Sequence, residues 1–335
     1  MPEYRHNLIT NRWVIIASQR NSRPRNFSHS SQNKLTDFDP ECPFCPGNEK
    51  MTPPETFAIR DAGSASDGTG WSIRVVPNKF PFLAPNGSTP LPGENLNHRK
   101  ATGRHEVLID SPHHSVHLAN QSFEHTCSIL QTLRNRYQAL AADDYVNHIS
   151  IFCNHGRSSG ASLAHPHFQI AAGSLVPPQV AAQIEYCRRY YNTNNHSVFQ
   201  DTIETELVAE ELVIAENNHF LAFCPPASMC TYEVYILPRL LQPRFGLLSD
   251  EQIPDLTEVL QKILKRLDTG YGNPDYNLIF HTAPVSVNDS EQTFRWYIQL
   301  YPRLSLSGGF ELATDIYINI ISPKSAAAFY RNETD

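Results

Sequence analysis

The sequence contains the same order of apolar segments twice, and this repeat restricts the possible folds more than any other feature. Each half reads as two strands, an amphipathic helix and two further strands, by the spacing of its apolar residues. In the first half these segments cover residues 72–77, 106–110, 123–144, 148–153 and 167–171. In the second half they cover residues 219–226, 233–238, 250–268, 276–281 and 295–302. A further strand is expected at 13–17, outside the repeat.

The two copies also share local sequence. Residues 106–109 read EVLI and residues 233–236 read EVYI, and each run lies at a similar distance before its last strand. If the chain is duplicated, residues 295–299 (RWYIQ) take the place of residues 165–169 (HPHFQ). Each copy would then be a mainly antiparallel sheet with a helix on one face, an α+β arrangement. Chance similarity of two sheet–helix segments is the alternative.

The stretch GASLAHPHFQI, residues 160–170, places two imidazoles and an amide at alternate positions. Side chains alternate across a strand, so His165, His167 and Gln169 are expected to project together. An imidazole is largely unprotonated near neutral pH and can attack phosphorus to give a phosphoramidate. The spacing therefore indicates a possible nucleophilic site, although partly buried structural histidines would show the same pattern.

A loop rich in small residues precedes this strand. Residues 154–162 read NHGRSSGAS, and backbone amides in such turns can bind phosphoryl oxygens. The loop lacks the lysine and the glycine spacing of a Walker sequence. Alone it is equally typical of an ordinary surface loop, and its meaning depends on the histidines that follow.

Seven cysteines occur, and Cys42 and Cys45 form a closely spaced pair in the sequence CPFC. This spacing suits one half of a tetrahedral zinc site. The missing ligands could come from the histidines of residues 111–117 (SPHHSVH) or from the HPH triplet. A redox pair at a helix start is the competing interpretation, but Pro46 and Gly47 disfavour a helix there.

Length limits the number of domains, and charge and hydropathy exclude several functional classes. A chain of 335 residues can form two domains, and we expect them at 1–178 and 195–335. The net charge is -7 and the basic residues are scattered, which argues against a nucleic-acid surface. No apolar run is long enough to cross a bilayer, and the N-terminus does not resemble a secretory signal, so a cytoplasmic location is expected.

The chain resembles the galactose-1-phosphate uridylyltransferases of the histidine-triad superfamily. The resemblance covers most of the chain and is carried by RHNLITNRWVIIASQRNSRP, CPFCPGNE, VVPNKFP, SPHHS, NHGRSSGASLAHPHFQ and the C-terminal GGFE. It implies a duplicated histidine-triad fold, a homodimer, and transfer of a nucleoside monophosphate between a nucleotide sugar and a sugar 1-phosphate through a nucleotidyl-histidine. The substrates expected first are UDP-glucose and a hexose 1-phosphate, with phosphate as the alternative acceptor.

By position in these motifs, the resemblance makes His167 the nucleophile. Gln169 and Ser162 would contact the transferring phosphate, and Asn154 and Gly160 would belong to the substrate-binding loop.

The resemblance also assigns residues outside this loop. Arg20 and Arg23 match a phosphate-contacting pair, although exposed arginines without a specific role would look the same. Asn78 matches a residue of the nucleotide pocket. A single structural zinc would be bound by Cys42, Cys45, His114 and His165.

The C-terminal strand departs from the family pattern. Some members carry a second metal whose ligands include histidines in this strand, whereas here Gln299 and Tyr301 are present, and we predict no second metal. His281, after the preceding strand, is expected to be a hydrogen-bonded structural histidine. These features are similar to those of an ADP-glucose phosphorylase, which passes AMP to phosphate. A simple hydrolase and a non-catalytic nucleotide-sugar sensor are further alternatives, and the base, sugar and acceptor stay open.

Overall fold

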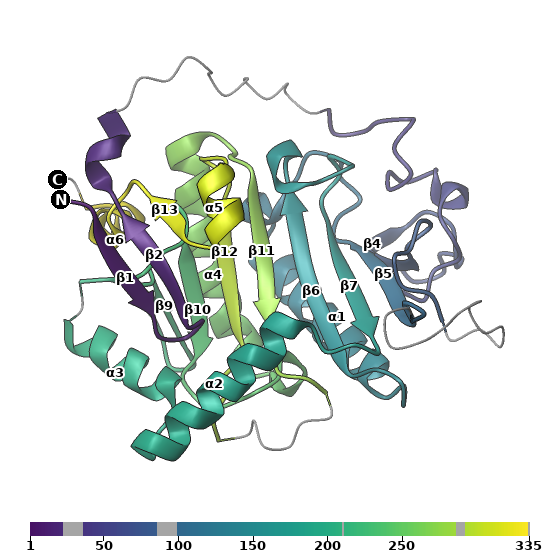
Figure 1. The fold of residues 1–335 in the computed structure, drawn as a ribbon. Helices are drawn as coiled ribbons and strands as arrows, with labels where there is room; N and C mark the ends of the chain where they lie inside the picture. The colour runs from purple at the N-terminus through teal and green to yellow at the C-terminus, as the bar shows by residue number, and fades with distance from the viewer. Residues whose placement is uncertain (23–35, 86–98, 210, 286–291, 334–335) are drawn as a thin grey trace.

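The computed structural model describes residues 1–22, 36–85, 99–209, 211–285 and 292–333, and its main element is one ten-stranded sheet (Figure 1). The strand order is β3-β4-β5-β7-β6-β11-β12-β10-β9-β8. The strands are β3 (Phe57–Arg60), β4 (Trp71–Pro77), β5 (Gly103–Ile109), β6 (His148–His155), β7 (His167–Gly173), β8 (Val213–Glu216), β9 (Phe220–Phe223), β10 (Val234–Pro238), β11 (Tyr276–His281) and β12 (Tyr297–Pro302). All pairings between them are antiparallel.

The strand order shows the internal repeat directly. From the centre outward, β6, β7, β5, β4 and β3 are matched by β11, β12, β10, β9 and β8. The two central strands, β6 and β11, pair with each other, with Asn154 opposite Asn277 and Ile151 opposite Phe280. The expected α+β fold with mainly antiparallel sheets is confirmed, and the sheets of the two copies are joined edge to edge into one.

The correspondence expected between residues 106–109 and 233–236 is wrong by one residue. Val107 pairs with Gln169, whereas Tyr235 pairs with Gln299. A slip of one residue moves a side chain to the opposite face of a sheet. Glu106 accordingly faces the helix side and binds Arg136 with contacts of 2.7 and 2.9 Å, so the residue equivalent to Glu233 is His105.

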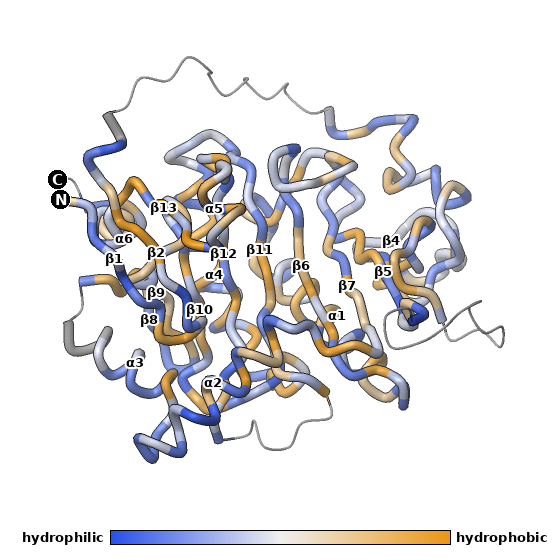
Figure 2. Tube along the Cα trace, in the orientation of Figure 1, coloured by the Kyte–Doolittle hydropathy of each residue, from blue (hydrophilic) through white to orange (hydrophobic). Residues whose placement is uncertain are grey.

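Helices α1 (Phe123–Ala141) and α4 (Gln252–Tyr271) cover one face of the sheet, where the largest apolar core lies. Figure 2 shows the apolar residues that form this core along the central strands. Ser122 caps α1 by accepting a hydrogen bond from the backbone amide of His125. Gln261 of α4 donates to Thr126 of α1 at 2.8 Å, which fixes the two helices relative to each other.

The opposite face of the sheet is divided into three zones. Its β4–β5 end packs against the segment that carries Cys42 and Cys45. Its β9–β10 end packs against α2 (Pro178–Asn194) and α3 (Val198–Ala209). Between these apolar zones, β5, β7, β6, β11 and β12 present polar side chains, and this polar strip contains the candidate site.

A small second sheet, β1 (Glu3–Asn7), β2 (Arg12–Ile16) and β13 (Tyr317–Asn319), lies over the second copy. Because β2 pairs with β13, the first residues of the chain associate with its last part. The remaining helices are α5 (Gly309–Thr314) and α6 (Pro323–Arg331). The proposed domain boundaries at 1–178 and 195–335 stay a prediction, since the central sheet continues across them.

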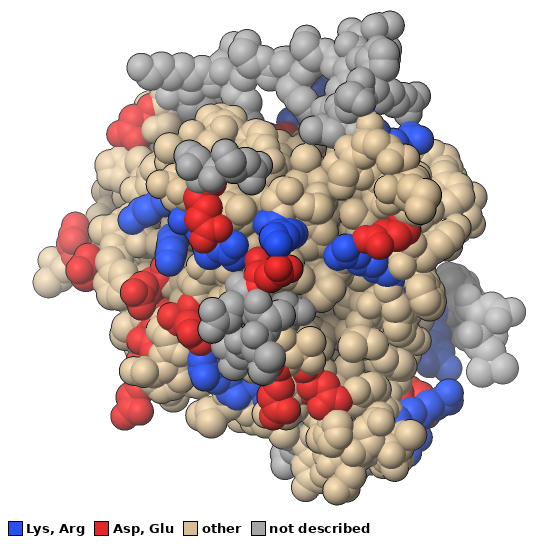
Figure 3. Space-filling model, turned by 90° about the vertical axis from the view of Figure 1, so that its left-hand side faces the viewer, with Lys and Arg blue, Asp and Glu red and all other residues tan. Residues whose placement is uncertain are grey.

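The face of the molecule shown in Figure 3 carries basic and acidic side chains interspersed, without a continuous basic surface. Within the described residues, no helix combines the length and the apolar character that a membrane span requires.

Candidate active site

His167, the predicted nucleophile, is the first residue of β7 and is 7% exposed. Its Nδ1 lies 2.8 Å from the carbonyl oxygen of His165 and must donate to it, because a carbonyl only accepts. This hydrogen bond places the free electron pair on Nε2. Burial lowers the pKa of His167, which favours the neutral ring that a nucleophile requires.

The loop before β7 is held by the second copy. Asp275 accepts hydrogen bonds of 2.6 Å from the backbone amide and the hydroxyl of Ser158. Gly156 has φ of 81°, and a Cβ there would lie 1.8 Å from a carboxylate oxygen of Asp275, so no other residue fits without a shift. The loop geometry is therefore fixed by contacts from the segment that enters β11.

Two amide side chains flank the nucleophile on neighbouring strand positions. Asn154 is the next-to-last residue of β6, and its Oδ1 accepts from Nδ2 of Asn277 at 2.7 Å. Gln169 lies on the same face of β7 as His167, and its Oε1 is 2.9 Å from Nε2 of His105. Both amide carbonyls thus have partners, while neither amide nitrogen has a hydrogen-bond acceptor among the residues that the structure describes.

His105 and Asn277 were not identified from the sequence. His105 also lies 3.3 Å from Nδ2 of Asn78, the predicted pocket residue, and its ring packs 4.1 Å from that of Phe82. The structure therefore places Asn78 and Gln169 on either side of the same ring nitrogen of His105, with Gln169 the nearer of the two. Strand alternation would have placed His105 on a sheet face, but only the pairing of β5 with β7 shows that this face is the one of Gln169.

The four predicted metal ligands meet in one buried cluster. The potential ligand atoms of Cys42, Cys45, His114 and His165 all lie within 4.8 Å of one another. The Sγ of Cys45 is 3.4 Å from Nδ1 of His114 and 3.6 Å from Nδ1 of His165. In a tetrahedral zinc site, metal–ligand bonds of about 2.3 and 2.0 Å place sulfur and nitrogen about 3.5 Å apart. The cluster therefore fits a divalent metal.

The surroundings of the cluster suit metal ligation as well. Nε2 of His165 donates to the carbonyl oxygen of Ser111 at 2.7 Å, which leaves Nδ1 free to ligate. Backbone amides of Phe44 and Asp39 approach Sγ of Cys42 and Cys45, each at 3.4 Å. These donors stabilise thiolates, and the two nearby imidazoles favour ligation over the redox interpretation.

The structure does not bring every predicted residue to His167. Ser162 is exposed, and Gly160, with φ of 91°, ends the short 3-10 turn of residues 157–159. Arg20 is exposed in η1 (Ser18–Ser22), which Figure 1 shows beside β1 and β2, away from β7. Arg23 lies outside the described residues. The roles of these four residues stay predictions.

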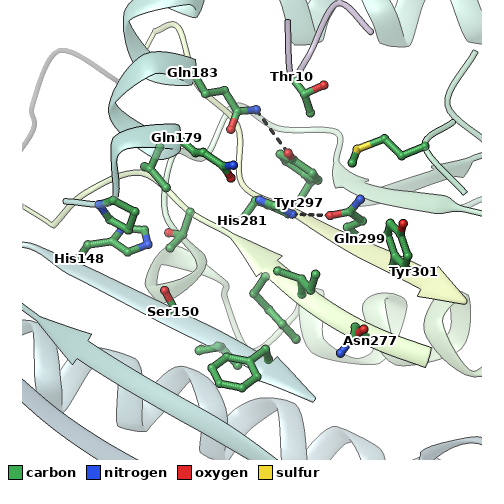
Figure 4. Close-up of a pocket in the computed structure, with 18 of the residues that line it drawn as sticks. Thr10, His148, Ser150, Gln179, Gln183, Asn277, His281, Tyr297, Gln299 and Tyr301 are labelled. Carbon is green, nitrogen blue, oxygen red and sulfur yellow. Dashed lines mark hydrogen bonds between the residues drawn. The ribbon is translucent and has the colours of Figure 1, made fainter. Parts of the chain in front are cut away.

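A cavity of about 590 Å³ opens next to Asn154, over β6, β11 and β12 (Figure 4). His281 is hydrogen-bonded to Gln299 at 2.8 Å and stacks on Tyr297, as expected for a structural histidine. Gln183 of α2 donates to the Tyr297 hydroxyl at 3.3 Å. Among the described residues, the Cys42 cluster is the one group of three or more close metal-ligating side chains, and the absence of a second metal stays a prediction.

Comparison with known proteins agrees with this geometry. The family model described as galactose-1-phosphate uridyl transferase, N-terminal domain, matches residues 1–177, and a domain of unknown function matches residues 102–329. The chain is 32% identical to ADP-glucose phosphorylase of Arabidopsis thaliana, over 98% of this chain and 92% of that protein. It is 27% identical to galactose-1-phosphate uridylyltransferase of Haemophilus influenzae, over 90% and 84%.

Among solved structures, an ADP-glucose phosphorylase from Arabidopsis thaliana with bound ADP-glucose superposes with a TM-score of 0.84, at 31% identity and full coverage of both chains. A uridylyltransferase structure at 23% identity, covering 99% of this chain and 98% of the other, has a TM-score of 0.75 and supports the fold alone. Fold and site together define an enzyme of the nucleotidyltransferase type. The chain belongs to the galactose-1-phosphate uridylyltransferase family.

Two histidines that line the cavity, the buried His148 and the half-buried His281, give a pH dependence of stability. Burial lowers the pKa of His148 to about 4 and of His281 to about 4, against about 6.5 in an unfolded chain. A pKa that is lower in the folded state contributes stability above pH 6.5, and this contribution is lost as the pH falls toward 4. We expect each histidine to remove roughly 1–2 kcal/mol of unfolding free energy between pH 7 and 5.

Denaturant unfolding of wild-type and His148→Gln protein at both pH values measures this effect. The variant should lose less stability on acidification than the wild type. His196→Gln, at a ring that is 52% exposed, serves as the control and should keep the wild-type dependence. Equal acid sensitivity of His148→Gln and the wild type would contradict the expectation.

Proposed function

We propose that this enzyme transfers a nucleoside monophosphate from a nucleotide sugar through a covalent nucleotidyl-His167. One observation carries the proposal: Nδ1 of His167 is fixed on the carbonyl of His165, so the lone pair of the ring lies on Nε2. Gln169 follows two residues later on the same face of β7, and Asn154 lies on the neighbouring strand β6. A buried, neutral imidazole with adjacent hydrogen-bond donors is the arrangement that attack on a phosphoryl group requires.

Two displacements complete the reaction. First, Nε2 attacks the α-phosphorus, the bond from phosphorus to the bridging oxygen breaks, and the sugar phosphate leaves with the electron pair of that bond. Second, an oxygen of the acceptor attacks the same phosphorus, the P–N bond breaks, and His167 is regenerated. The carbonyl of His165 stabilises the N–H of the ring while Nε2 is bonded to phosphorus.

We propose ADP-glucose as the first donor to test, with inorganic phosphate as acceptor. The support is the 32% identity to an ADP-glucose phosphorylase over nearly the whole of both chains. UDP-glucose with a hexose 1-phosphate is the second candidate, supported by the family model and by the uridylyltransferase relatives. In both cases His167 carries the nucleotide.

The metal in the Cys42 cluster is proposed to be zinc with a structural role. Two thiolates and two imidazoles complete a tetrahedral set, which leaves no position for substrate. When bound, the ion would fix His165, and therefore the carbonyl that orients His167. Its loss should reduce both stability and the correct placement of the nucleophile.

A homodimer is proposed, as the family resemblance implies, and exposed apolar side chains near the small second sheet are candidates for its interface. Trp13 on β2 is 51% exposed, and Leu312 on α5 is 80% exposed. Arg12 and Asp315 lie 3.5 Å apart and show that these two elements are neighbours. Light scattering should give twice the mass of one chain, and Leu312→Asp should shift the protein toward monomer. A monomeric wild type would contradict this proposal.

The covalent intermediate gives the main prediction. Incubation with ADP-glucose or UDP-glucose labelled in the α-phosphate should place acid-labile label on His167, because a phosphoramidate hydrolyses in acid. His167→Gln should take up no label, while His219→Gln should behave as the wild type. No label from either sugar nucleotide would contradict the proposal and favour a nucleotide-sugar sensor. Release of free nucleoside monophosphate without an acceptor would favour a hydrolase.

The metal proposal is tested separately. Purified protein should contain one zinc per chain, and Cys45→Ser should lose it together with several degrees of melting temperature. Cys127→Ser is the matched control, because Cys127 is a half-buried cysteine that contacts Thr257 rather than the cluster. An unchanged melting temperature and activity in Cys45→Ser would show that the cluster does not act as a metal site.

A further inference from the structure

The side-chain amides of Asn154 and Gln169 share one feature: a neighbouring side chain donates a hydrogen bond to the carbonyl end of each. An amide side chain has a donor end and an acceptor end of nearly the same shape, so its orientation depends on its hydrogen-bond partners. Only the NH₂ end can donate to phosphoryl oxygens. The partners that hold the other end therefore decide whether the amide attracts or repels a phosphate.

For Asn154 the orientation follows from an arginine. Nε of Arg303 lies 2.6 Å from Oδ1 of Asn277, and a guanidinium can only donate. Nδ2 of Asn277 consequently faces Asn154 Oδ1 at 2.7 Å and the carbonyl oxygen of Ser159 at 2.9 Å. Asn154 is then left with its NH₂ group for a ligand. Both Asn277 and Arg303 come from the second copy.

For Gln169 the orientation follows from the tautomer of His105. The Nδ1 of His105 is buried and has no hydrogen-bond partner among the described residues. A buried N–H without an acceptor is rarer in proteins than an unused lone pair, so the proton belongs on Nε2. Nε2–H then donates to Gln169 Oε1 at 2.9 Å, and the NH₂ group of Gln169 is directed away from His105. The NH₂ group of Asn78 also faces this Nε2, but at 3.3 Å the contact is longer than a normal hydrogen bond, so the shorter contact with Gln169 decides the tautomer.

The second copy has an equivalent glutamine, but both ends of its amide are bound by protein side chains. Gln299, the equivalent of Gln169, donates to Glu233 at 2.5 Å and accepts from His281 at 2.8 Å. Both ends of that amide therefore have protein partners, and its NH₂ group is held by Glu233. In the first copy His105 replaces Glu233, and within the described residues the NH₂ group of Gln169 has no protein acceptor.

We propose that His105 and Asn277 are positioning residues that direct the NH₂ groups of Gln169 and Asn154 at the phosphoryl group bound to His167. This inference deepens the proposed function and rests on it. Neither residue touches the reacting atoms. Each acts by holding an amide carbonyl, so that two donors meet the charge that develops on the phosphoryl oxygens without reorganisation.

The experiment measures the single-turnover rate of nucleotidyl-His167 formation and the affinity for AMP and for UMP by calorimetry, in the full-length protein. Asn277→Ala and His105→Leu should each lower the rate by ~10–100-fold, since loss of one donor to a developing oxyanion costs up to ~10³-fold. His105→Gln, whose Nε2 can occupy the place of the imidazole Nε2, should restore the rate to within a few-fold of wild type. His219→Gln is the control outside the site.

Double variants separate positioning from a structural role. His105→Leu should have no further effect in a Gln169→Ala background, and Asn277→Ala none in an Asn154→Ala background, because the amide on which each acts is gone. Melting temperature and metal content should stay near those of the parent variants. Additive losses, or equal losses in His105→Leu and His105→Gln, would overturn the inference.

The outcomes distinguish failure of the proposed function from failure of the inference about His105 and Asn277. If the wild type forms no adduct, the proposed function fails, and the same double-variant comparison on nucleotide affinity still decides the inference. If the adduct forms but the effects are additive, the inference alone fails. A wild type that binds neither AMP nor UMP overturns the inference, because the directed donors require an anion.

Discussion

The pairing of β6 with β11 is the contact on which the rest of the structure depends. It joins two copies of a small α+β unit into one sheet, so that polar residues of the second copy reach the loop before the nucleophile. Asp275 fixes the turn at Ser158, and Asn277 holds both Asn154 and the carbonyl of Ser159. A single copy would leave these groups to water. Duplication therefore supplies rigidity that a catalytic loop needs.

The metal cluster constrains the other side of His167. With a metal bound, His165 would ligate it through Nδ1; the same residue donates through Nε2 to the carbonyl oxygen of Ser111 and accepts from His167 with its own backbone carbonyl. One residue thus links the segment of Cys42 and Cys45 to the tautomer of the nucleophile. A shift of His165 would move its carbonyl oxygen away from His167 Nδ1, so that the proton would no longer be fixed on that nitrogen. Metal binding by His165 would therefore influence the tautomer of His167 through a backbone atom.

Local signals in the sequence predicted most of the elements that form the site. The helices near residues 123–144 and 250–268 and the central strands of both copies follow from helical spacing and strand alternation, whereas the outer strands β3 and β8 and the helices α2 and α3 were not predicted. The full Cys42 cluster came from the family resemblance, because the residues alone gave the pair Cys42 and Cys45 and a choice of histidines. His105 and Asn277 were missed because their roles depend on which strands are neighbours. The one-residue error in aligning Glu106 with Glu233 has the same origin: similar letters, but opposite faces of the sheet.

The second copy keeps the strand geometry of the first but has different side chains at the positions of the candidate site. Tyr297 stands in the place of His167, and its ring is fully buried, stacked on His281 and hydrogen-bonded to Gln183. Gln299 is satisfied at both ends. The polar groups of Tyr297 and Gln299 are thus held by neighbouring side chains. In the first copy, by contrast, nitrogen atoms of His167, Gln169 and Asn154 have no partner among the described residues. Leaving buried donors and acceptors unpaired lowers the stability of the fold, and a bound ligand can offset this loss.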